Sequence, residues 1–157
     1  MTAPSSDDAL GAVLGIAGAE GTFLDILGLR QLEWSDGYAR LGLEVERRHT
    51  NTVGLLHGGV ILSLLDVGGA MACLYGRRER YVAITVNQNT SFVSAHRSRT
   101  AIVEARLIGK GRRLCFTETT VFDAESDTLC ATALGTYNLF RRERGSTAEA
   151  TTATDQE

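Results

Sequence analysis

The sequence predicts an α+β fold in which an antiparallel β-sheet wraps around one long central helix. Six segments have the composition or the two-residue alternation of strands, and several exceed the usual five or six residues, which favours a sheet that curls around something. The longest apolar segment starts at His57-Gly58-Gly59 and continues to Tyr75. It is the only segment long and apolar enough to be the helix that the sheet encloses.

Turn signals separate the expected strands. Ser35-Asp36-Gly37 predicts a hairpin, because Gly37 can adopt a positive φ. Gly109-Lys110-Gly111 and residues 123–127 are the short joints of a later antiparallel meander. The odd positions from 129 to 139 are Leu, Ala, Ala, Gly, Tyr and Leu, which predicts one buried face for the last strand. The expected strands are Leu29–Trp34, Tyr38–Glu46, Tyr81–Val93, Thr100–Ile108, Arg113–Phe122 and Leu129–Phe140.

The chain length suits one domain with loose ends. It has 157 residues, of which 43% are hydrophobic, enough for one core. We expect an N-terminal arm over residues 1–22, with a short helix at about 9–18 that Asp7 and Asp8 cap. The working domain covers 23–144. Residues 145–157 lack large apolar side chains and are predicted to be a disordered tail.

Charge and cysteine usage disfavour several classes of function. The net charge is -3 and the basic residues are scattered, which argues against a nucleic-acid partner. No positive charge precedes the first apolar run and no apolar stretch resembles a membrane span, so we expect a cytoplasmic protein without a membrane partner. Cys73, Cys115 and Cys130 lie too far apart for a zinc or redox motif. We expect three reduced core thiols, no metal and no cofactor.

Asp66 interrupts the apolar central helix. At helical spacing its neighbours are mostly small, and such a face lets a second backbone approach, for example that of another subunit. A buried unpaired carboxylate is costly, so Asp66 must be partnered, hydrated or functional. The structural alternative is an Asp that a nearby backbone group or arginine satisfies, with His57-Gly58-Gly59 serving only as a helix start.

The residues around Asp66 favour the functional interpretation. Asn51, His57, Gly58-Gly59 and Asp66 combine an amide, an imidazole, exposed helix N-terminal N–H groups and a carboxylate in one turn-and-helix unit. Helix N-termini attract negative charge and can stabilise a developing oxyanion.

The same residues carry a family resemblance. Asn51 lies six residues before His57, Gly58-Gly59 follow, and Asp66 lies nine residues after His57. This spacing resembles the motif of the hotdog-fold acyl-CoA thioesterases, specifically the PaaI-like (phenylacetic acid degradation) group, and the likeness extends over about residues 27–140. The resemblance implies a hotdog fold, an acyl-CoA substrate, and a homo-oligomer: a dimer with a continuous sheet, often a dimer of dimers (a homotetramer). It also implies active sites at the subunit interface.

The resemblance implies a role for each motif residue. Asp66 is expected to be the general base or nucleophile, and the Gly58 backbone N–H to bind the thioester carbonyl oxygen. Asn51 would position substrate or the attacking water, and His57 would shape the loop. Whether Asp66 activates water or attacks directly to form an anhydride stays open, with water favoured because it needs less precise geometry.

On the strand after the helix, Thr85 is expected to assist at the reacting centre. Thr85, Asn87, Asn89 and Ser91 are predicted to share one face by strand alternation. The alternative is a polar ladder at an edge or interface.

The coenzyme A end is expected at a basic turn. Its glycines allow close backbone approach and its cations can bind phosphates, although a solvated turn is the alternative. The resemblance adds a nearby aromatic, Phe92. The sequence departs from the family at Ser94-Ala95, where a proline often precedes the alanine, and at the following His96-Arg97. The turn consists of Gly109, Lys110, Gly111, Arg112 and Arg113.

The acyl group is expected to be aromatic or medium-chain. Leu55, Leu56, Val60, Leu64 and the N-terminal segment are candidates for an apolar pocket. Two rival functions stay open. One is a hotdog hydratase or dehydratase, in which His57 would be the main acid-base group. The other is a non-catalytic acyl-CoA-binding module.

Overall fold

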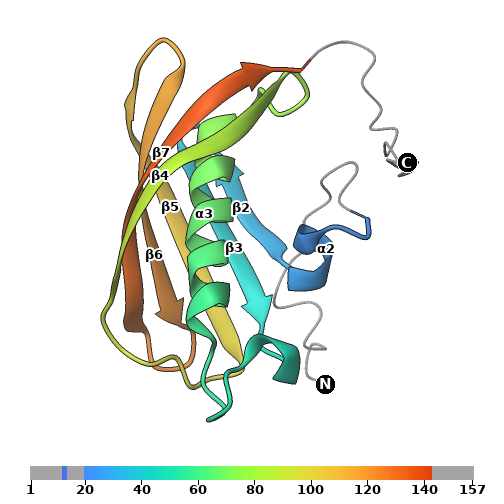
Figure 1. Cartoon of the computed structure of the whole chain (residues 1–157), viewed down its shortest axis with the longest axis vertical. Helices are drawn as coiled ribbons and strands as arrows, with labels where there is room; N and C mark the ends of the chain where they lie inside the picture. The colour runs from blue at the N-terminus through green and yellow to red at the C-terminus, as the bar shows by residue number, and fades with distance from the viewer. Residues whose placement is uncertain (1–11, 14–19, 143–157) are drawn as a thin grey trace, which may run out of the picture.

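The computed structural model describes residues 12–13 and 20–142, which form a curved antiparallel sheet around one long helix (Figure 1). The sheet order is β1-β2-β3-β5-β6-β7-β4. The helical elements are α2 (Phe23–Leu27), the 3-10 turn η1 (Arg47–His49) and α3 (Gly58–Leu74). The strands are β1 (Ala12–Val13), β2 (Arg30–Ser35), β3 (Tyr38–Glu44), β4 (Tyr81–Phe92), β5 (Thr100–Lys110), β6 (Leu114–Asp123) and β7 (Thr128–Arg141).

The predicted α+β fold, the central helix and the six strands are confirmed, with end shifts of a few residues. Gly37 has a φ of 71° in the turn between β2 and β3, as its position predicted. The helix expected at about 9–18 is wrong at the two positions described there: Ala12 and Val13 pair with Gln31 and Arg30 of β2. An edge strand offers unpaired backbone groups, and Ala12 and Val13 pair with them instead of forming a helical turn. The rest of that range and the predicted tail lie outside the described residues.

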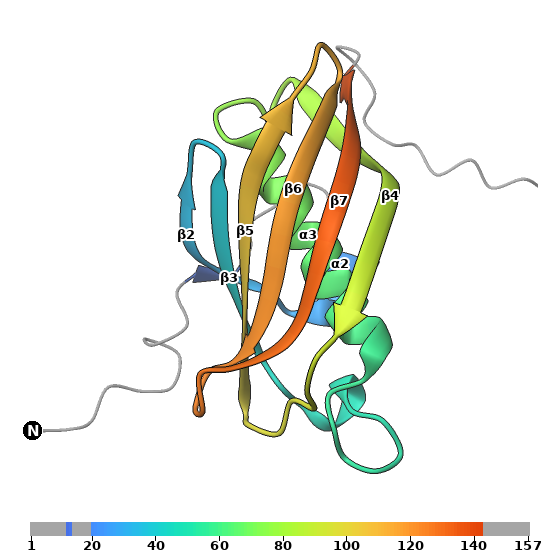
Figure 2. The ribbon, with the colours of Figure 1, turned by 90° about the vertical axis from the view of Figure 1, so that its left-hand side faces the viewer.

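The concave face of the sheet packs against α3 and forms the core (Figure 2). Leu64 and Leu65 of α3 are at most 1% exposed, and they pack among buried residues of β3, β5 and β6 such as Leu41, Val103 and Val121. All three cysteines are buried and free, as predicted. No helix in the described ranges combines the length and hydropathy needed to cross a bilayer.

Small residues on α3 serve close packing within the protomer. A Cβ on Gly69 would strike the Tyr137 hydroxyl of β7, and one on Gly68 would lie 3.0 Å from Val103 of β5. The small face was expected to let a second backbone approach, for example that of another subunit; at Gly69 and Cys73 that backbone belongs to the protomer's own sheet. Both residues face this sheet, because Tyr137 needs the space that a larger helix residue would fill.

Strand β4 is an edge of the sheet and carries a bulge. Thr85 pairs with Tyr137 and Asn87 with Thr136, so the register shifts at Val86. A bulge adds one residue and reverses the alternation of faces beyond it. The predicted shared face of Thr85 with Asn87, Asn89 and Ser91 is therefore wrong. Thr85 faces α3, and beyond the bulge Gln88 contacts it.

Candidate functional site

The N-terminus of α3 presents a free backbone donor. His57 is the N-cap residue, and its Nδ1 accepts a hydrogen bond from Gly59 N at 2.9 Å. Gly58 occupies the first helical position, where the N–H has no intrahelical acceptor, and none is found elsewhere in the described residues. The helix dipole adds partial positive charge at this point. The Gly58 N–H is thus available to an external oxygen.

Asn51 holds the loop that leads into α3. Its Oδ1 accepts hydrogen bonds from Val53 N at 3.1 Å and from Leu55 N at 3.0 Å. Its backbone N–H donates to Leu55 O at 2.8 Å. The amide therefore fixes the shape of this loop through its oxygen, and the residue also lines the neighbouring cavity.

A cavity of about 370 Å³ lies beside the first turn of α3. Asn51 and Gly58 line it, together with other residues from the start of α3 and from the end of β4 and the loop after it. Leu55 and Leu56 belong to the wall, as predicted, whereas Val60 and Leu64 pack into the core instead and Ile61 takes their place. The lining is Asn51, Leu55, Leu56, Gly58, Ile61, Phe92, Val93, Ser94, Ala95 and His96.

Asp66 is half-buried and is oriented by β4. Thr85 Oγ1 donates a hydrogen bond to Asp66 Oδ1 at 2.7 Å, so the structure brings these two predicted residues together. Tyr137 Oη donates to the Asp66 backbone oxygen at 3.0 Å and anchors the helix there. Burial, with the nearby Asp66 and Cys73, raises the pKa of the Tyr137 phenol, which therefore stays a protonated donor.

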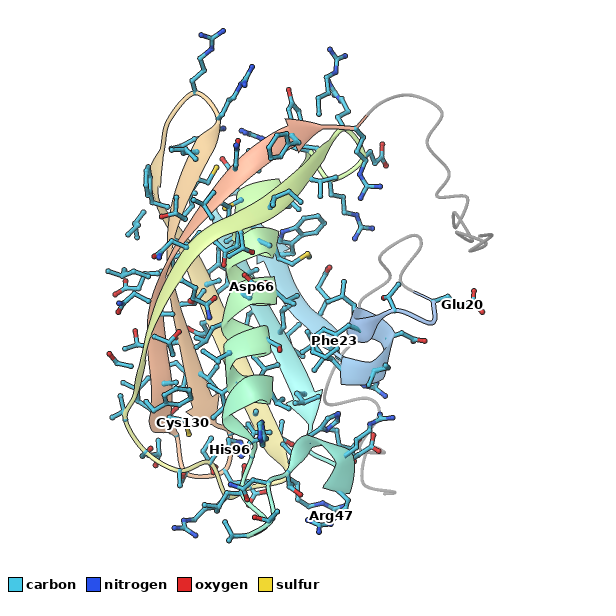
Figure 3. The ribbon with its side chains drawn as sticks, viewed as in Figure 1. Glu20, Phe23, Arg47, Asp66, His96 and Cys130 are labelled. Atoms are coloured by element: carbon cyan, nitrogen blue, oxygen red, sulfur yellow. The ribbon has the colours of Figure 1, made fainter. Side chains whose placement is uncertain are left out.

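Asp66 and Gly58 are far apart within one protomer. Figure 3 shows Asp66 midway along α3. Eight residues separate the two positions, and at 1.5 Å per residue the axial distance is about 12 Å. A reacting carbon must lie within about 3–3.5 Å of its attacking group. A thioester carbon in direct contact with the carboxylate therefore cannot also place its carbonyl oxygen at the N–H of the same helix.

A second cavity, of about 360 Å³, is strongly basic. It contains Lys110, Arg112 and Arg113 of the predicted turn, and none of its lining residues is acidic. Arg77 and Arg141 add two further cations. The lining is Arg77, Tyr81, Lys110, Arg112, Arg113, Leu139, Phe140 and Arg141. Such clustered cations suit a polyanionic group such as phosphate.

The predicted aromatic partner of this turn lies at the other end of the sheet. Phe92 pairs with Ala131, while Lys110 pairs with Cys115 and through it with Tyr137. Six residues along β7 correspond to about 20 Å. The Phe92 ring instead lies 3.7 Å from where a Cβ on Gly58 would be. Within one protomer the structure does not bring Phe92 to the turn.

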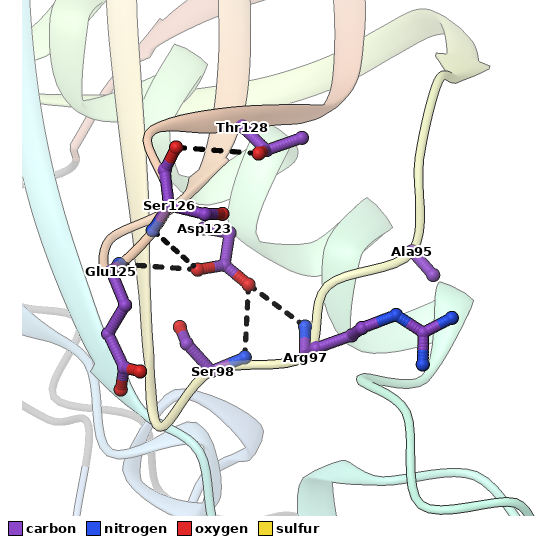
Figure 4. A pocket seen from close by; sticks show the side chains of 7 residues that line it. All are labelled: Ala95, Arg97, Ser98, Asp123, Glu125, Ser126 and Thr128. Carbon is purple, nitrogen blue, oxygen red and sulfur yellow. Dashed lines mark hydrogen bonds between the residues drawn. The ribbon is translucent and has the colours of Figure 1, made fainter.

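The Asp123 carboxylate holds the loop after β4 through backbone hydrogen bonds. Figure 4 shows Asp123 Oδ2 accepting from the N–H groups of Arg97 and Ser98 at 2.9 and 3.0 Å. Its Oδ1 accepts from Glu125 N and Ser126 N at 3.2 and 3.3 Å. Burial alone would raise the pKa of Asp123, but the donors outweigh it and hold that pKa well below its ordinary value. The loop carrying His96 is therefore rigidly placed.

Sequence reasoning missed four residues at these sites. Tyr137 was placed on a buried face, but nothing in the pattern indicated its bond to the helix. Gln88 donates to Leu62 O at 3.2 Å, and only knowledge of the bulge could have put it there. Arg77 and Arg141 lie in arginine-rich segments at 77–80 and 141–142, which is the one signal that could have suggested the basic cavity.

Comparison with known proteins points to one family. A family model described as thioesterase superfamily matches residues 53–130. Acyl-coenzyme A thioesterase 13 of Homo sapiens is 30% identical over 98 residues, which cover 62% of this chain and 69% of that protein. The solved thioesterase superfamily member 2 of zebrafish is 27% identical with a TM-score of 0.71, covering 79% of this chain and 91% of that one.

A third relative was solved with a ligand. It is a protein of Streptococcus mutans UA159 bound to acetyl-CoA, with a TM-score of 0.65 and 19% identity. The match covers 74% of this chain and 91% of that chain. At this identity the likeness establishes the fold.

Replacing Asp123 by Asn should destabilise the protein. Asn offers one acceptor oxygen where the carboxylate satisfies four N–H groups, and buried unpaired donors cost about 1–3 kcal/mol. Because the folded pKa of Asp123 is lowered, its contribution is complete well above the unfolded value of about 3.9 and is lost as the pH falls further. Urea unfolding should show that the free energy of unfolding differs more between wild type and variant at pH 7 than at pH 3. The same difference in free energy of unfolding at both pH values would contradict this account.

Proposed function

The chain belongs to the thioesterase superfamily and is a thioester hydrolase, and on that premise we propose that it hydrolyses acyl-CoA thioesters at a site shared by two protomers. The observation that carries the proposal is on α3: a carboxylate oriented by Thr85 and a free N–H at Gly58, on one helix yet about 12 Å apart. Two copies of the helix could place the carboxylate of one and the N–H of the other at the same thioester.

The named relatives support the substrate class. The human relative is called an acyl-coenzyme A thioesterase, and the Streptococcus mutans protein was solved with acetyl-CoA. The basic cavity at Lys110, Arg112 and Arg113 supplies donors for the phosphates of coenzyme A. An acyl-CoA substrate accounts for both the thioester chemistry and this charge.

The edge strand β4 supports a dimer. It presents a long unpaired edge within the described residues, with Ile84 50% and Val86 60% exposed. An exposed edge of this kind favours pairing with another strand. Antiparallel pairing of two copies would bring the Thr85 half of one β4 toward the Phe92 half of the other. Asp66 of one protomer would then approach Gly58 of the second, and further association into a homotetramer is compatible with this pairing.

The same pairing reconciles the two predicted coenzyme A contacts. Phe92 lies at one end of β4, and Tyr81, which lines the basic cavity, lies at the other. Antiparallel pairing places Phe92 of one protomer toward the basic cavity of the second. We therefore assign a single coenzyme A molecule to Phe92 of one copy and to residues 109–113 of the other.

Each group has a definite task in the reaction. Asp66 takes a proton from water as the water attacks the thioester carbon, or attacks that carbon itself; water needs the less demanding geometry. The Gly58 N–H of the other protomer stabilises the oxyanion that forms. Thr85 orients the carboxylate, and Asn51 and His57 hold the loop that presents the N–H. The C–S bond then breaks, and coenzyme A leaves as a thiolate. On the water route the thiolate takes the proton from Asp66; on the direct route water then hydrolyses the anhydride, which restores the carboxylate and supplies the proton.

The cavity beside Gly58 supports an aromatic or medium-chain acyl group. Its volume is about 370 Å³, and Leu55, Leu56 and Ile61 give it apolar walls. Burial of apolar surface there would favour such a group by about 25 cal/mol per Å². The dehydratase alternative is less well supported, because His57 Nδ1 already accepts from Gly59 N and caps the helix.

Free-thiol release from phenylacetyl-, benzoyl-, hexanoyl- and palmitoyl-CoA tests the proposal. Asp66→Asn keeps an oxygen that can accept from Thr85 but removes the base, so turnover should fall about 100- to 10,000-fold. Asp36→Asn, in the exposed β2–β3 turn, is the matched control and should retain full activity. Full activity in Asp66→Asn, or no turnover by wild type, would contradict the proposal.

Gly58→Pro isolates the oxyanion donor. Proline fits the first position of a helix, and His57, with φ -67° and ψ 137°, has the backbone that a residue before proline prefers. The substitution replaces the N–H by a ring methylene group and should lower kcat about 100- to 1,000-fold without unfolding the protein. Gly58→Ala keeps the N–H and should stay close to wild type in the same assay. Equal activity of the two variants would show that this N–H does not act.

A further inference from the structure

His96 has an orphaned acceptor beside the cavity at the start of α3. His96 is 1% exposed and lies near the start of α3 (Figure 3). It lines the cavity that Gly58 also lines. Its Nδ1 is buried and has no hydrogen-bond partner in the described residues. Buried polar groups without a partner are rare, and each calls for an explanation.

The other ring nitrogen determines the state of Nδ1. His96 Nε2 lies 3.0 Å from Thr100 O, an oxygen that can only accept. Nε2 must therefore carry the proton, and in the neutral ring Nδ1 is left as a bare acceptor. The missing partner of Nδ1 is consequently an N–H or O–H group.

The loop around His96 makes this acceptor a fixed feature. Asp123 binds the backbone N–H groups of Arg97 and Ser98, directly after His96, and Ser94 Oγ donates to Leu129 O at 2.6 Å before it. Phe92 and Val93, which line the same cavity, are 55% and 58% exposed, so the cavity beside this fixed acceptor is open to solvent.

We propose that His96 Nδ1 accepts a hydrogen bond from an N–H or O–H group of the bound thioester. This inference rests on the proposed function and adds a recognition residue to it. Every acyl-CoA carries one such donor close to the reacting centre: the amide N–H two methylene groups from the thioester sulfur. A hydroxyl on the acyl group would offer the same chemistry from the other side of the carbonyl. With Gly58 holding the carbonyl oxygen, His96 fixes the ligand at a second point.

Two variants separate recognition from structure. In His96→Gln the side-chain amide can still donate to Thr100 O but lacks an acceptor at the Nδ1 position. In His96→Asn the side-chain oxygen takes the Nδ1 position, while the bond to Thr100 O is lost. His96→Gln should therefore keep the wild-type Tm and lose recognition. His96→Asn should have a lower Tm and keep recognition.

Two pairs of substrates identify the donor. Hexanoyl-S-N-acetylcysteamine is compared with its ester isostere, the hexanoyl thioester of 2-mercaptoethyl acetate, in which oxygen replaces the N–H. Hexanoyl-CoA is compared with 6-hydroxyhexanoyl-CoA. We expect wild type to prefer the amide in kcat/KM by about fivefold or more, the worth of one hydrogen bond, and His96→Gln to lose this preference. Loss of a preference for the hydroxyacyl group instead would place the donor on the acyl side.

Binding of S-hexyl-coenzyme A, a thioether that cannot be hydrolysed, provides a readout independent of turnover. Its Kd, measured by calorimetry, should rise about fivefold or more in His96→Gln and remain near wild type in His96→Asn. Absence of wild-type turnover would overturn the proposed function while this measurement still tests His96. Unchanged substrate preferences together with an unchanged Kd in His96→Gln would overturn the inference.

Discussion

The rise of an α-helix is the constraint on which the account of this protein depends. Asp66 and Gly58 sit on one rigid helix, eight residues and about 12 Å apart. In the proposed function, each copy of α3 therefore contributes to two different reaction centres, its carboxylate to one and its N–H to the other. A two-fold arrangement of two helices would complete both centres at once, because an isologous interface repeats every contact.

The rest of the protomer fixes the positions of the Asp66 carboxylate and of the Gly58 N–H. Tyr137 beneath Gly69 sets the distance between α3 and β7 and bonds to the Asp66 backbone. The bulge at Val86 lets both Thr85 and Gln88 face the helix. At the other end, Asn51 and His57 shape the entry of α3 through backbone hydrogen bonds. Two groups that have no hydrogen-bond partner in the described residues, Gly58 N–H and His96 Nδ1, border the same cavity.

Much of this architecture follows from sequence patterns of short range. Period-two alternation gave the strands, glycine-containing turns gave their joints, and one long apolar run gave the helix. The family resemblance, and not a pattern in the chain, placed Thr85 near the reacting centre; in the structure its hydroxyl contacts Asp66. Helix periodicity could not say whether Gly69 faces a second subunit or Tyr137, since both partners favour small residues. Nor does alternation reveal a bulge, which is why Asn87 was assigned to the face that Gln88 occupies.

The basic cavity shows a different limit of prediction from sequence. Lys110, Arg112 and Arg113 are adjacent in sequence and could be recognised as a cluster, whereas Arg77 and Arg141 join them only because α3 and β7 end at the same place. The orphaned Nδ1 of His96 is likewise a property of packing. A histidine in a loop gives no sign in sequence that one nitrogen is bonded and the other is not.

Hybrid oligomers test the shared site most directly. Asp66→Asn and Gly58→Pro subunits, each inactive alone, are co-expressed in equal amounts and assayed for acyl-CoA hydrolysis. If Asp66 of one protomer works with Gly58 of another, random mixing restores about a quarter of wild-type activity, because one pairing in four contains neither substitution. If each protomer holds a complete site, every site carries one of the two substitutions. Activity no greater than that of the parent variants would contradict the account.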